Sequence, residues 1–297
     1  MSHNHHDHQH NIVNKTKNFR TVFLLNFGFT IFEIIGGILT NSVAIISDAL
    51  HDLGDTVSIG LAWFLERYSH KESDNKFSYG YGRFSMLGAL INALILIIGS
   101  TFVLANAIPR LIKPEATNAE GMILFAIIGV AVNGAAVFKL KNEQSINARV
   151  LMIHLLEDVL GWIAILAVAI TLLFWQTYIL DAILSIAITV YILYNVIKTL
   201  KGTIALFLQA TPQHIDIAAV DKKLTSIEKV ISSHHTHVWS LDGVNHILTT
   251  HLIVDRSTTR QEILQIKLNC KQLFEDLHLT HFTIEIELED EVCLMVK

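Results

Sequence analysis

Two pairs of side chains with identical spacing are candidate metal ligands. His51 precedes Asp55 by four residues, and His154 precedes Asp158 by the same interval. Residues four apart share one face of a helix, so each pair can direct an imidazole and a carboxylate toward a common point. Two such pairs on facing helices supply four N and O ligands, which Zn²⁺ accepts in tetrahedral geometry. Ca²⁺ and Mg²⁺ prefer all-oxygen shells with six or more ligands.

The distribution of histidine favours this metal site. A lone His on an apolar helix is more often a hydrogen-bonded core residue than a ligand. Residues 20–208, however, contain only three His; two of them begin the matched pairs, and His70 lies in a predicted loop. Cd²⁺, Co²⁺ or Fe²⁺ could share the same donor set, whereas Mn²⁺ would favour more oxygen ligands. The sequence therefore predicts a site for one Zn²⁺-like dication.

Two further carboxylates lie on the same helix faces as these pairs. Asp48 lies three residues before His51, and we expect it to accept the second imidazole N–H and so fix the tautomer. Glu157 lies three residues after His154, where it is a similar supporting group, an additional ligand or a proton site.

Six apolar segments must position these side chains. They run roughly over residues 19–40, 43–65, 84–108, 121–140, 150–174 and 178–200. Each is near the ~20 residues that a helix needs to cross ~30 Å of hydrocarbon. Charged residues make up only 16% of the chain, against roughly 25% in soluble domains. The sequence thus predicts an α-helical membrane protein with six transmembrane helices.

Ionisable side chains inside such segments need compensation. Each charge at the bilayer centre costs ~2.5–3.5 kcal/mol. No Lys or Arg lies deep in the segments, so we expect a cation from outside the chain, or partial protonation, to compensate. We expect Glu33 and Asp181 to bridge helices or to line a wet cavity. The carboxylates are Glu33, Asp48, Asp52, Asp55, Glu157, Asp158 and Asp181.

Lys and Arg collect on one side of the predicted membrane, and the other side has only Arg110 and Lys113. The positive-inside rule then puts both termini in the cytoplasm, which six spans allow. The compact loops favour a bacterial inner membrane. The residues on the cytoplasmic side are Lys15, Lys17, Arg20, Arg67, Lys71, Lys76, Arg83, Lys139, Lys141, Arg149, Lys198 and Lys201.

After Gln209 the composition becomes that of a soluble domain, and Pro212 marks the boundary. The patterns predict helices at 215–231 and 260–277 and strands at 237–241, 246–254 and 281–288. This order indicates a two-layer α+β unit. We therefore divide the chain into a cytoplasmic tail (1–18), a transmembrane domain (19–208) and a small cytoplasmic domain (209–297).

The remaining features of the sequence exclude several classes. The tail is polar, unlike a secretory signal, and contains His3, His5, His6, His8 and His10. Cys270 and Cys293 are too few for a disulfide framework, so we expect two free thiols. A net charge of −5 gives no basic signature for nucleic-acid binding.

With these residues in view, the chain resembles the cation diffusion facilitator family, specifically its zinc-exporting branch. The segment 42–55, Ser-Val-Ala-Ile-Ile-Ser-Asp-Ala-Leu-His-Asp-Leu-Gly-Asp, is similar to the family's second-span motif, and His154-x-x-x-Asp158 resembles its fifth-span partner. Tyr79-Gly-Tyr-Gly-Arg-Phe84 resembles the Gly-rich loop before the third span, and His237-Val-Trp-Ser-Leu241 the first strand of the cytoplasmic domain. The likeness covers about residues 19–290.

The resemblance implies a six-span homodimer with a ferredoxin-like cytoplasmic domain. It implies that Zn²⁺ leaves the cytoplasm in exchange for protons, with His51, Asp55, His154 and Asp158 as the transport site. It also implies a cytoplasmic metal site. The His residues of the tail themselves indicate either a collector of cytoplasmic zinc or a dispensable segment. The candidates for the cytoplasmic site are His234, His237, His251, Glu285 and Glu287.

The chain departs from the family pattern at several positions. Ser85 stands where Glu is usual, and Glu157 where Gly is common before the Asp. Phe77 and Tyr81 stand where other members carry loop histidines, which predicts no metal site in this loop. Cys293 has no neighbouring Cys, which argues against a Cys-pair site at the C-terminus.

Two other classes of function also use buried His and carboxylates. An intramembrane metallohydrolase needs three ligands, an open position for water and a Glu base, often as His-Glu-x-x-His, but no second His follows His154 in that register. A metal receptor that does not transport would bind zinc without flux.

Overall fold

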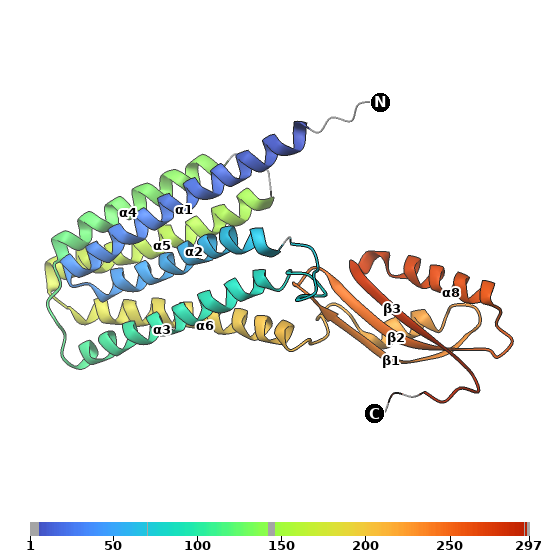
Figure 1. The fold of residues 1–297 in the computed structure, drawn as a ribbon. Helices are drawn as coiled ribbons and strands as arrows, with labels where there is room; N and C mark the ends of the chain where they lie inside the picture. The colour runs from blue at the N-terminus through green and yellow to red at the C-terminus, as the bar shows by residue number, and fades with distance from the viewer. Residues whose placement is uncertain (1–5, 70, 142–145, 294, 296–297) are drawn as a thin grey trace. The chain divides into compact units, whose positions relative to one another are not determined.

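A computed structural model of the chain describes residues 6–69, 71–141, 146–293 and 295, with the backbone alone at 6–22, 63, 66–67, 146–148 and 150–151. The described residues up to 66 and within 88–200 form a helical unit, and those within 67–87 and from 201 onward form a second unit. Six long helices come first along the chain (Figure 1). They are α1 (His6–Thr40), α2 (Val43–Ser69), α3 (Phe84–Ile112), α4 (Ala119–Leu140), α5 (Ile146–Trp175) and α6 (Ile179–Phe207).

Five of these helices are long and apolar enough to cross a membrane, judged over the described residues. The exception is α2, although its 27 residues would extend ~40 Å. Its apolar run is interrupted by Asp48, His51, Asp52 and Asp55. The sequence predicted six spans, and the count of five differs because α2 carries candidate ligands.

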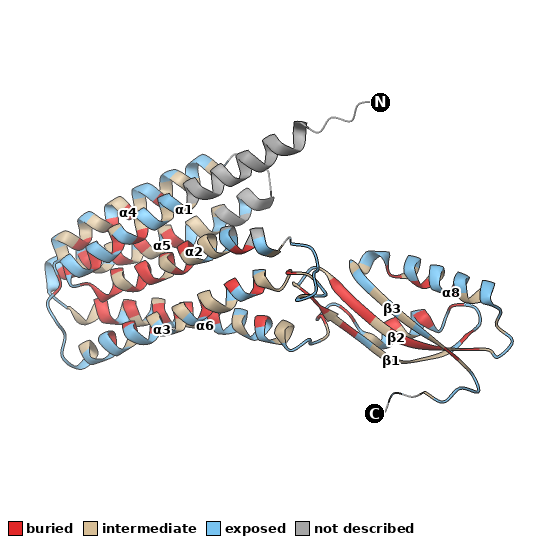
Figure 2. Cartoon of the chain, viewed as in Figure 1, coloured by how far each residue is buried: buried red, intermediate tan, exposed pale blue. Residues whose placement is uncertain are grey.

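Exposed residues lie along the outside of the long helices (Figure 2), and many of them are large and apolar. Ile98 and Phe102 of α3 and Phe138 of α4 expose 69%, 65% and 76% of their surface, whereas Ser100 and Thr189 are fully buried. Extended apolar surfaces are rare on soluble monomers and mark contact with a membrane or a partner. This distribution suits a hydrocarbon solvent around the helices.

Close packing against α4 holds α5 in place. Trp162 of α5 is fully buried, and a Cβ at Gly129 of α4 would come within 2.2 Å of its ring. Gly129 therefore lets the two helices approach closely. The candidate ligands His154 and Asp158 lie on this same α5, about two turns and one turn before Trp162, respectively.

A buried carboxylate on α6 fixes the start of α2. Asp181 accepts hydrogen bonds from Ser42 Oγ at 2.5 Å, from the Val43 amide at 2.8 Å and from the Ala44 amide at 3.4 Å. It therefore satisfies backbone donors that the first turn of a helix leaves unpaired. Asp181 does bridge helices, as the sequence analysis expected of it.

The second unit is a three-stranded sheet with two helices. Its strand order is β1-β2-β3, with β1 antiparallel to β2 and β2 parallel to β3. The predicted order of helices and strands is confirmed. The elements are α7 (Ile217–Leu224), β1 (Val230–Ser240), β2 (His246–Val254), α8 (Arg260–Leu273), a 3₁₀ turn (Glu275–Leu277) and β3 (Leu279–Leu288).

Both helices of this unit pack on one face of the sheet. Leu224 of α7 and Ile266 of α8 share a buried core with Leu248 and Leu252 of β2. Successive side chains of a strand point to opposite faces, so His251 of β2 lies on the face without helices. The strand β1 begins earlier than predicted, because irregular pairing near residues 231 and 235–236 breaks its alternation.

The loop between α2 and α3 is organised around Asp74. This carboxylate accepts hydrogen bonds from the Tyr81 hydroxyl at 2.7 Å, the Phe77 amide at 2.8 Å and the Lys76 amide at 2.9 Å. The hydrogen bonds, led by that of Tyr81, hold the pKa of Asp74 well below its usual range. Lys71 contributes an ion pair at 3.3 Å.

Removing the Asp181 carboxylate should destabilise the helical unit. We expect Asp181→Ala to lower the free energy of unfolding by about 2–3 kcal/mol, because it leaves buried donors of Ser42, Val43 and Ala44 unpaired. Asp181→Asn keeps one acceptor oxygen and should lose less. Thermal unfolding in detergent measures both variants, and a wild-type midpoint for Asp181→Ala would contradict this role.

Candidate metal centre

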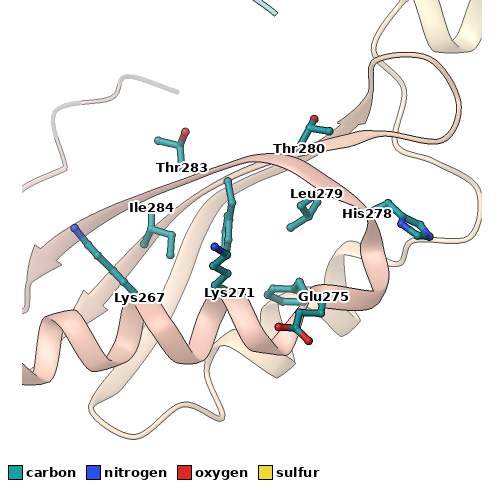
Figure 3. Close-up of a pocket in the computed structure, with 10 residues that line it drawn as sticks. Lys267, Lys271, Glu275, His278, Leu279, Thr280, Thr283 and Ile284 are labelled. Atoms are coloured by element: carbon teal, nitrogen blue, oxygen red, sulfur yellow. The ribbon is translucent and has the colours of Figure 1, made fainter. Parts of the chain in front are cut away.

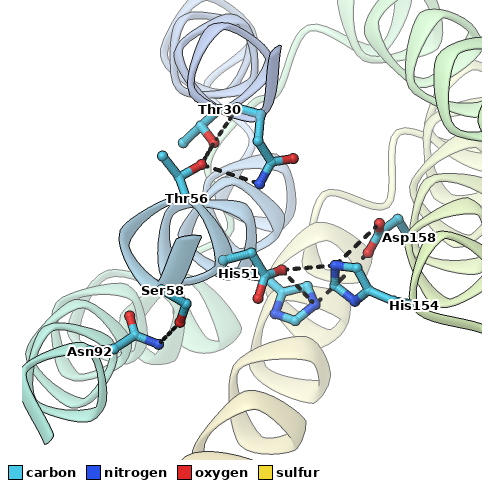
Figure 4. A network of polar contacts seen from close by, with 9 residues as sticks. Thr30, His51, Thr56, Ser58, Asn92, His154 and Asp158 are labelled. Carbon is cyan, nitrogen blue, oxygen red and sulfur yellow. Dashed lines mark hydrogen bonds and ion pairs between the residues drawn. The ribbon is translucent and has the colours of Figure 1, made fainter. Parts of the chain in front are cut away.

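Four side chains from α2 and α5 meet inside the helical unit (Figure 4). His154 Nε2 lies 3.1 Å from Asp55 Oδ2 and 3.9 Å from Asp158 Oδ2. His51 Nε2 lies 3.8 Å from Asp55 Oδ2 and 3.9 Å from Asp158 Oδ1. Each imidazole therefore faces one carboxylate from its own helix and one from the other. The helical spacing read from the sequence produces this arrangement.

These separations match a tetrahedral ion. Metal–ligand bonds of ~2.1 Å give a tetrahedron with edges of about 3.4 Å, in the middle of the observed 3.1–3.9 Å range. Donor atoms of His51, His154 and Asp158 lie within 4.8 Å of one another, and Asp55 joins them through both imidazoles. One dication could contact all four side chains after small adjustments.

The oxygens at this centre are available to a cation. Asp55 Oδ2 and Asp158 Oδ1 are buried, and neither accepts a hydrogen bond from any described residue. Buried carboxylate oxygens without donors are costly unless a positive charge lies nearby. The His51 and His154 side chains remain about one-third exposed, at 29% and 34%, so an ion can reach the donors and leave them.

The two carboxylates expected to support the imidazoles lie elsewhere. Asp48 is buried, with Oδ1 only 3.2 Å from where a Cβ of Gly161 would stand, so it points at the backbone of α5. Among the described residues, Asp48 has no hydrogen bond to either imidazole. Glu157 is exposed, and the described residues offer it no ion pair. Both supporting roles therefore stay predictions.

A polar seam joins α1 to the other side of α2. Thr56 Oγ1 lies 3.3 Å from Asn26 Nδ2 and 3.1 Å from Thr30 Oγ1 (Figure 4). Further along this seam, Glu33 is fully buried, and neither of its carboxylate oxygens has a hydrogen-bond partner in the described part of the chain. Asp52 faces Glu33 there. Asp52 and Thr56 are four residues apart and therefore share one face of α2. This spacing could have indicated the second polar face from the sequence.

A second cluster of candidate ligands lies on the open face of the sheet. Glu287 Oε1 lies 2.7 Å from His251 Nδ1, and Glu287 Oε2 lies 3.2 Å from His234 Nε2. Glu285 Oε2 lies 3.3 Å from His251 Nε2, and its side chain is mostly exposed. The pairing of His234 with His251 and of His251 with Glu285 across the strands creates the cluster.

The structure does not bring His237 into this cluster. It is exposed and pairs with Thr249, because the irregular pairing between His234 and His237 shifts the register. The ring of His235 instead lies 5.2 Å from that of His251, centroid to centroid. The sequence did not predict that His235 would replace His237 beside His251, because the alternation of apolar and polar residues does not reveal where a strand bulges.

Electrostatics at this cluster favour an ionised Glu287. Burial raises the pKa of its carboxyl, but hydrogen bonds with His251 and Cys293 and the nearby His234 outweigh burial and hold the pKa below its usual range. The sequence analysis did not predict Cys293 as a member of this cluster. It considered only a site made by a pair of Cys residues, and no second Cys lies near Cys293 in the sequence.

A pocket of about 710 Å³ lies elsewhere on this unit, between α8 and β3 (Figure 3). It is lined by Lys267, Lys271 and Glu275 beside apolar residues such as Phe274 and Ile284. None of the candidate ligands in the sheet cluster lines this pocket. Its two Lys side chains are poor neighbours for a metal cation.

Comparison with known proteins decides the family. The profile of the cation efflux transmembrane domain matches residues 20–208. The chain belongs to the cation diffusion facilitator family. A match of this extent includes α2 and α5 with all four residues of the centre.

Three relatives align with nearly the whole of this chain. A cadmium, cobalt and zinc/H⁺-K⁺ antiporter of Bacillus subtilis is 30% identical over 95% of this chain and 92% of its own length. The metal cation efflux system protein CzcD of Cupriavidus metallidurans is 30% identical over 95% and 90%. The zinc transporter ZitB of Pectobacterium atrosepticum is 30% identical over 96% and 89%.

The family assignment fixes the general activity. This facilitator is an integral membrane protein that moves metal cations out, and it is a transporter, as its relatives are, rather than an enzyme. The metallohydrolase alternative is thereby excluded. The centre on α2 and α5 lies within the matched domain and is therefore a candidate site for the transported ion. The cluster on the sheet lies outside that domain.

Neighbouring carboxylates on α5 offer a matched test of the centre. We expect Asp158→Asn to weaken Zn²⁺ binding by more than about 100-fold, because it removes a charged ligand. Glu157→Gln, on the exposed side of the same turn, should bind as the wild type does. Calorimetry in detergent measures both, with His251→Ala in every sample to silence the sheet cluster. Equal losses in both variants would contradict the assignment.

Proposed function

We propose that this protein exports Zn²⁺ from the cytoplasm in exchange for protons, through a tetrahedral site of His51, Asp55, His154 and Asp158. The observation that carries the proposal is the convergence of these four donors at 3.1–3.9 Å, with buried oxygens that accept no hydrogen bond from any described residue. The printed names of relatives that transport zinc support the choice of ion.

The chemical types of the ligands couple metal binding to proton release. Ligation needs a neutral imidazole and an ionised carboxylate, so Zn²⁺ entering from the cytoplasm displaces protons from the site. Histidine titrates near neutrality, which allows protons to displace the metal again on the far side. Movement of α2 and α5 between two access states completes the cycle. Because both helices contribute two ligands, a change in their packing opens the site.

The proposal includes a specific topology. We propose that α2 also spans the membrane, which gives six transmembrane helices and puts both termini in the cytoplasm. The domains are then a tail (1–18), a transmembrane domain (19–208) and a ferredoxin-like cytoplasmic domain (209–297). The Lys and Arg distribution supports this orientation, and the compact loops support a bacterial inner membrane. We also propose a homodimer, as the family resemblance implies.

Other dications fit the same donors. Two imidazoles and two carboxylates also suit Cd²⁺, Co²⁺ and Fe²⁺. The names of the relatives from Bacillus subtilis and Cupriavidus metallidurans mention cadmium and cobalt in one case and metal cations in general in the other. We propose that selectivity is for this class of borderline ion rather than for Zn²⁺ alone.

The cytoplasmic domain is proposed to bind the same ion as a regulatory ligand. His234, His251, Glu285 and Glu287 supply donors on the open face of its sheet, and His237 lies outside their cluster. The His side chains of the tail lie outside the described residues, and we retain the tail as a collector of zinc or a dispensable segment. A receptor that binds zinc without transporting it remains the alternative, which flux measurements distinguish.

Removal of one ligand should stop transport. In vesicles that hold a zinc-sensitive dye, we expect an imposed proton gradient to drive Zn²⁺ flux through the wild type and a protonophore to abolish it. Asp55→Ala should give no flux above that of protein-free vesicles. Glu115→Ala, which removes an exposed carboxylate paired with Arg110, is the control and should retain flux. Wild-type flux through Asp55→Ala would refute the site.

Deletion of residues 2–11 tests the tail. We expect the maximal rate of Zn²⁺ flux to be unchanged, because the four ligands of the transport site lie on α2 and α5. If the tail collects metal, the Zn²⁺ concentration that gives half-maximal flux rises. A complete loss of flux in vesicles with equal protein content would be inconsistent with either role.

A further inference from the structure

The end of the chain turns back onto the open face of the sheet. After β3, the amide of Glu289 donates to the Val254 carbonyl at 3.1 Å. Glu291 then closes a turn in two ways, since its amide donates to the Leu288 carbonyl at 2.9 Å and its carboxylate accepts from the Leu288 amide at 2.7 Å. Two residues later, Cys293 Sγ lies 3.8 Å from His251 Nδ1.

This turn delivers a sulfur donor to the sheet cluster. Donor atoms of His234, His251, Glu287 and Cys293 all lie within 4.8 Å of one another. His234 Nε2 is buried and lies 3.2 Å from Glu287 Oε2, so its ring points into the cluster. The four donors come from β1, β2, β3 and the segment that follows β3.

The donor set identifies the class of ion. Two imidazoles, one carboxylate and one thiolate supply four donors, all of types that Zn²⁺ binds in tetrahedral geometry. With bonds of ~2.1 Å to nitrogen or oxygen and ~2.3 Å to sulfur, the tetrahedron has edges of about 3.4–3.7 Å. The observed separations, from 2.7 Å between His251 Nδ1 and Glu287 Oε1 to at most 4.8 Å, lie on both sides of this size, so ligation needs shifts of about 1 Å. A thiolate ligand disfavours Mg²⁺ and Ca²⁺, which prefer oxygen.

We propose that Cys293 completes a His₂-Glu-Cys site, with His234, His251 and Glu287, for one borderline-soft dication within a single chain. This inference rests on the proposed cytoplasmic role above and adds a ligand and a metal class to it. The Cys293 thiol loses its proton to solvent as the sulfur–metal bond forms. The site selects Zn²⁺, Cd²⁺ or Co²⁺ and excludes hard cations.

The other cysteine provides a matched control. Cys270 lies on α8, fully buried in the core on the opposite face of the sheet. Burial raises the pKa of its thiol to about 11, so it is neither a ligand nor a reactive nucleophile near neutral pH. A signal that needs a thiolate can therefore be assigned to one cysteine or the other by single substitutions.

Cobalt spectroscopy on the full-length protein in detergent tests the site. His51→Ala and His154→Ala are present in every sample, so that the transport site does not contribute. We expect Co²⁺ to produce a thiolate-to-cobalt charge-transfer band in the near ultraviolet. This band should persist in Cys270→Ser and vanish in Cys293→Ser. A missing band in the parent protein, or a band that survives Cys293→Ser, would overturn the proposal.

Alkylation gives a second readout that does not depend on cobalt. With free Zn²⁺ at ten times the dissociation constant, the rate of Cys293 alkylation by iodoacetamide should fall about tenfold, because only the metal-free fraction reacts. Equivalent Mg²⁺ or Ca²⁺ should leave the rate unchanged. Equal protection by Mg²⁺, or none by Zn²⁺, would overturn the proposal. Because neither readout uses the transport ligands, a failure here is distinct from a failure of flux.

Discussion

The central constraint on this molecule is the burial of negative charge among apolar helices. Asp158 and Glu33 have carboxylate oxygens that are buried and accept no hydrogen bond from any described residue. Isolated charges in such surroundings are strongly unfavourable, and the removal of one partner of a buried pair is more harmful than the pair is helpful. A cation held at the proposed centre would offset this buried negative charge, as Lys and Arg do in soluble proteins.

The fold holds α2 from three sides so that its ligands stay in register. Asp181 of α6 binds its first turn, Thr30 of α1 bonds to Thr56, and α5 brings His154 to Asp55. These contacts are polar and directional, so they define discrete arrangements better than apolar packing alone.

The two metal clusters show how similar donors acquire different character from their surroundings. On α2 and α5 the ligands come in pairs from helical spacing, and two of the four side chains are about one-third exposed imidazoles. On the sheet, three strands and the chain end each contribute one donor, and sulfur joins nitrogen and oxygen. An N₂O₂ set with access to solvent favours exchange, whereas a closed set with thiolate favours retention.

The sequence by itself predicted the helical unit, the order of elements in the second unit and the four side chains that meet at the centre on α2 and α5. Those features follow from local rules: apolar length, alternation, and the four-residue spacing that puts His51 and Asp55 on one helix face. Tertiary structure alone decided that Cys293 joins the sheet cluster while His237 stays outside it. A bulge in β1 and a turn after Leu288 set those positions, and both depend on pairing with distant strands. The direction of Asp48, toward Gly161 of α5 instead of an imidazole, was likewise a matter of packing between helices.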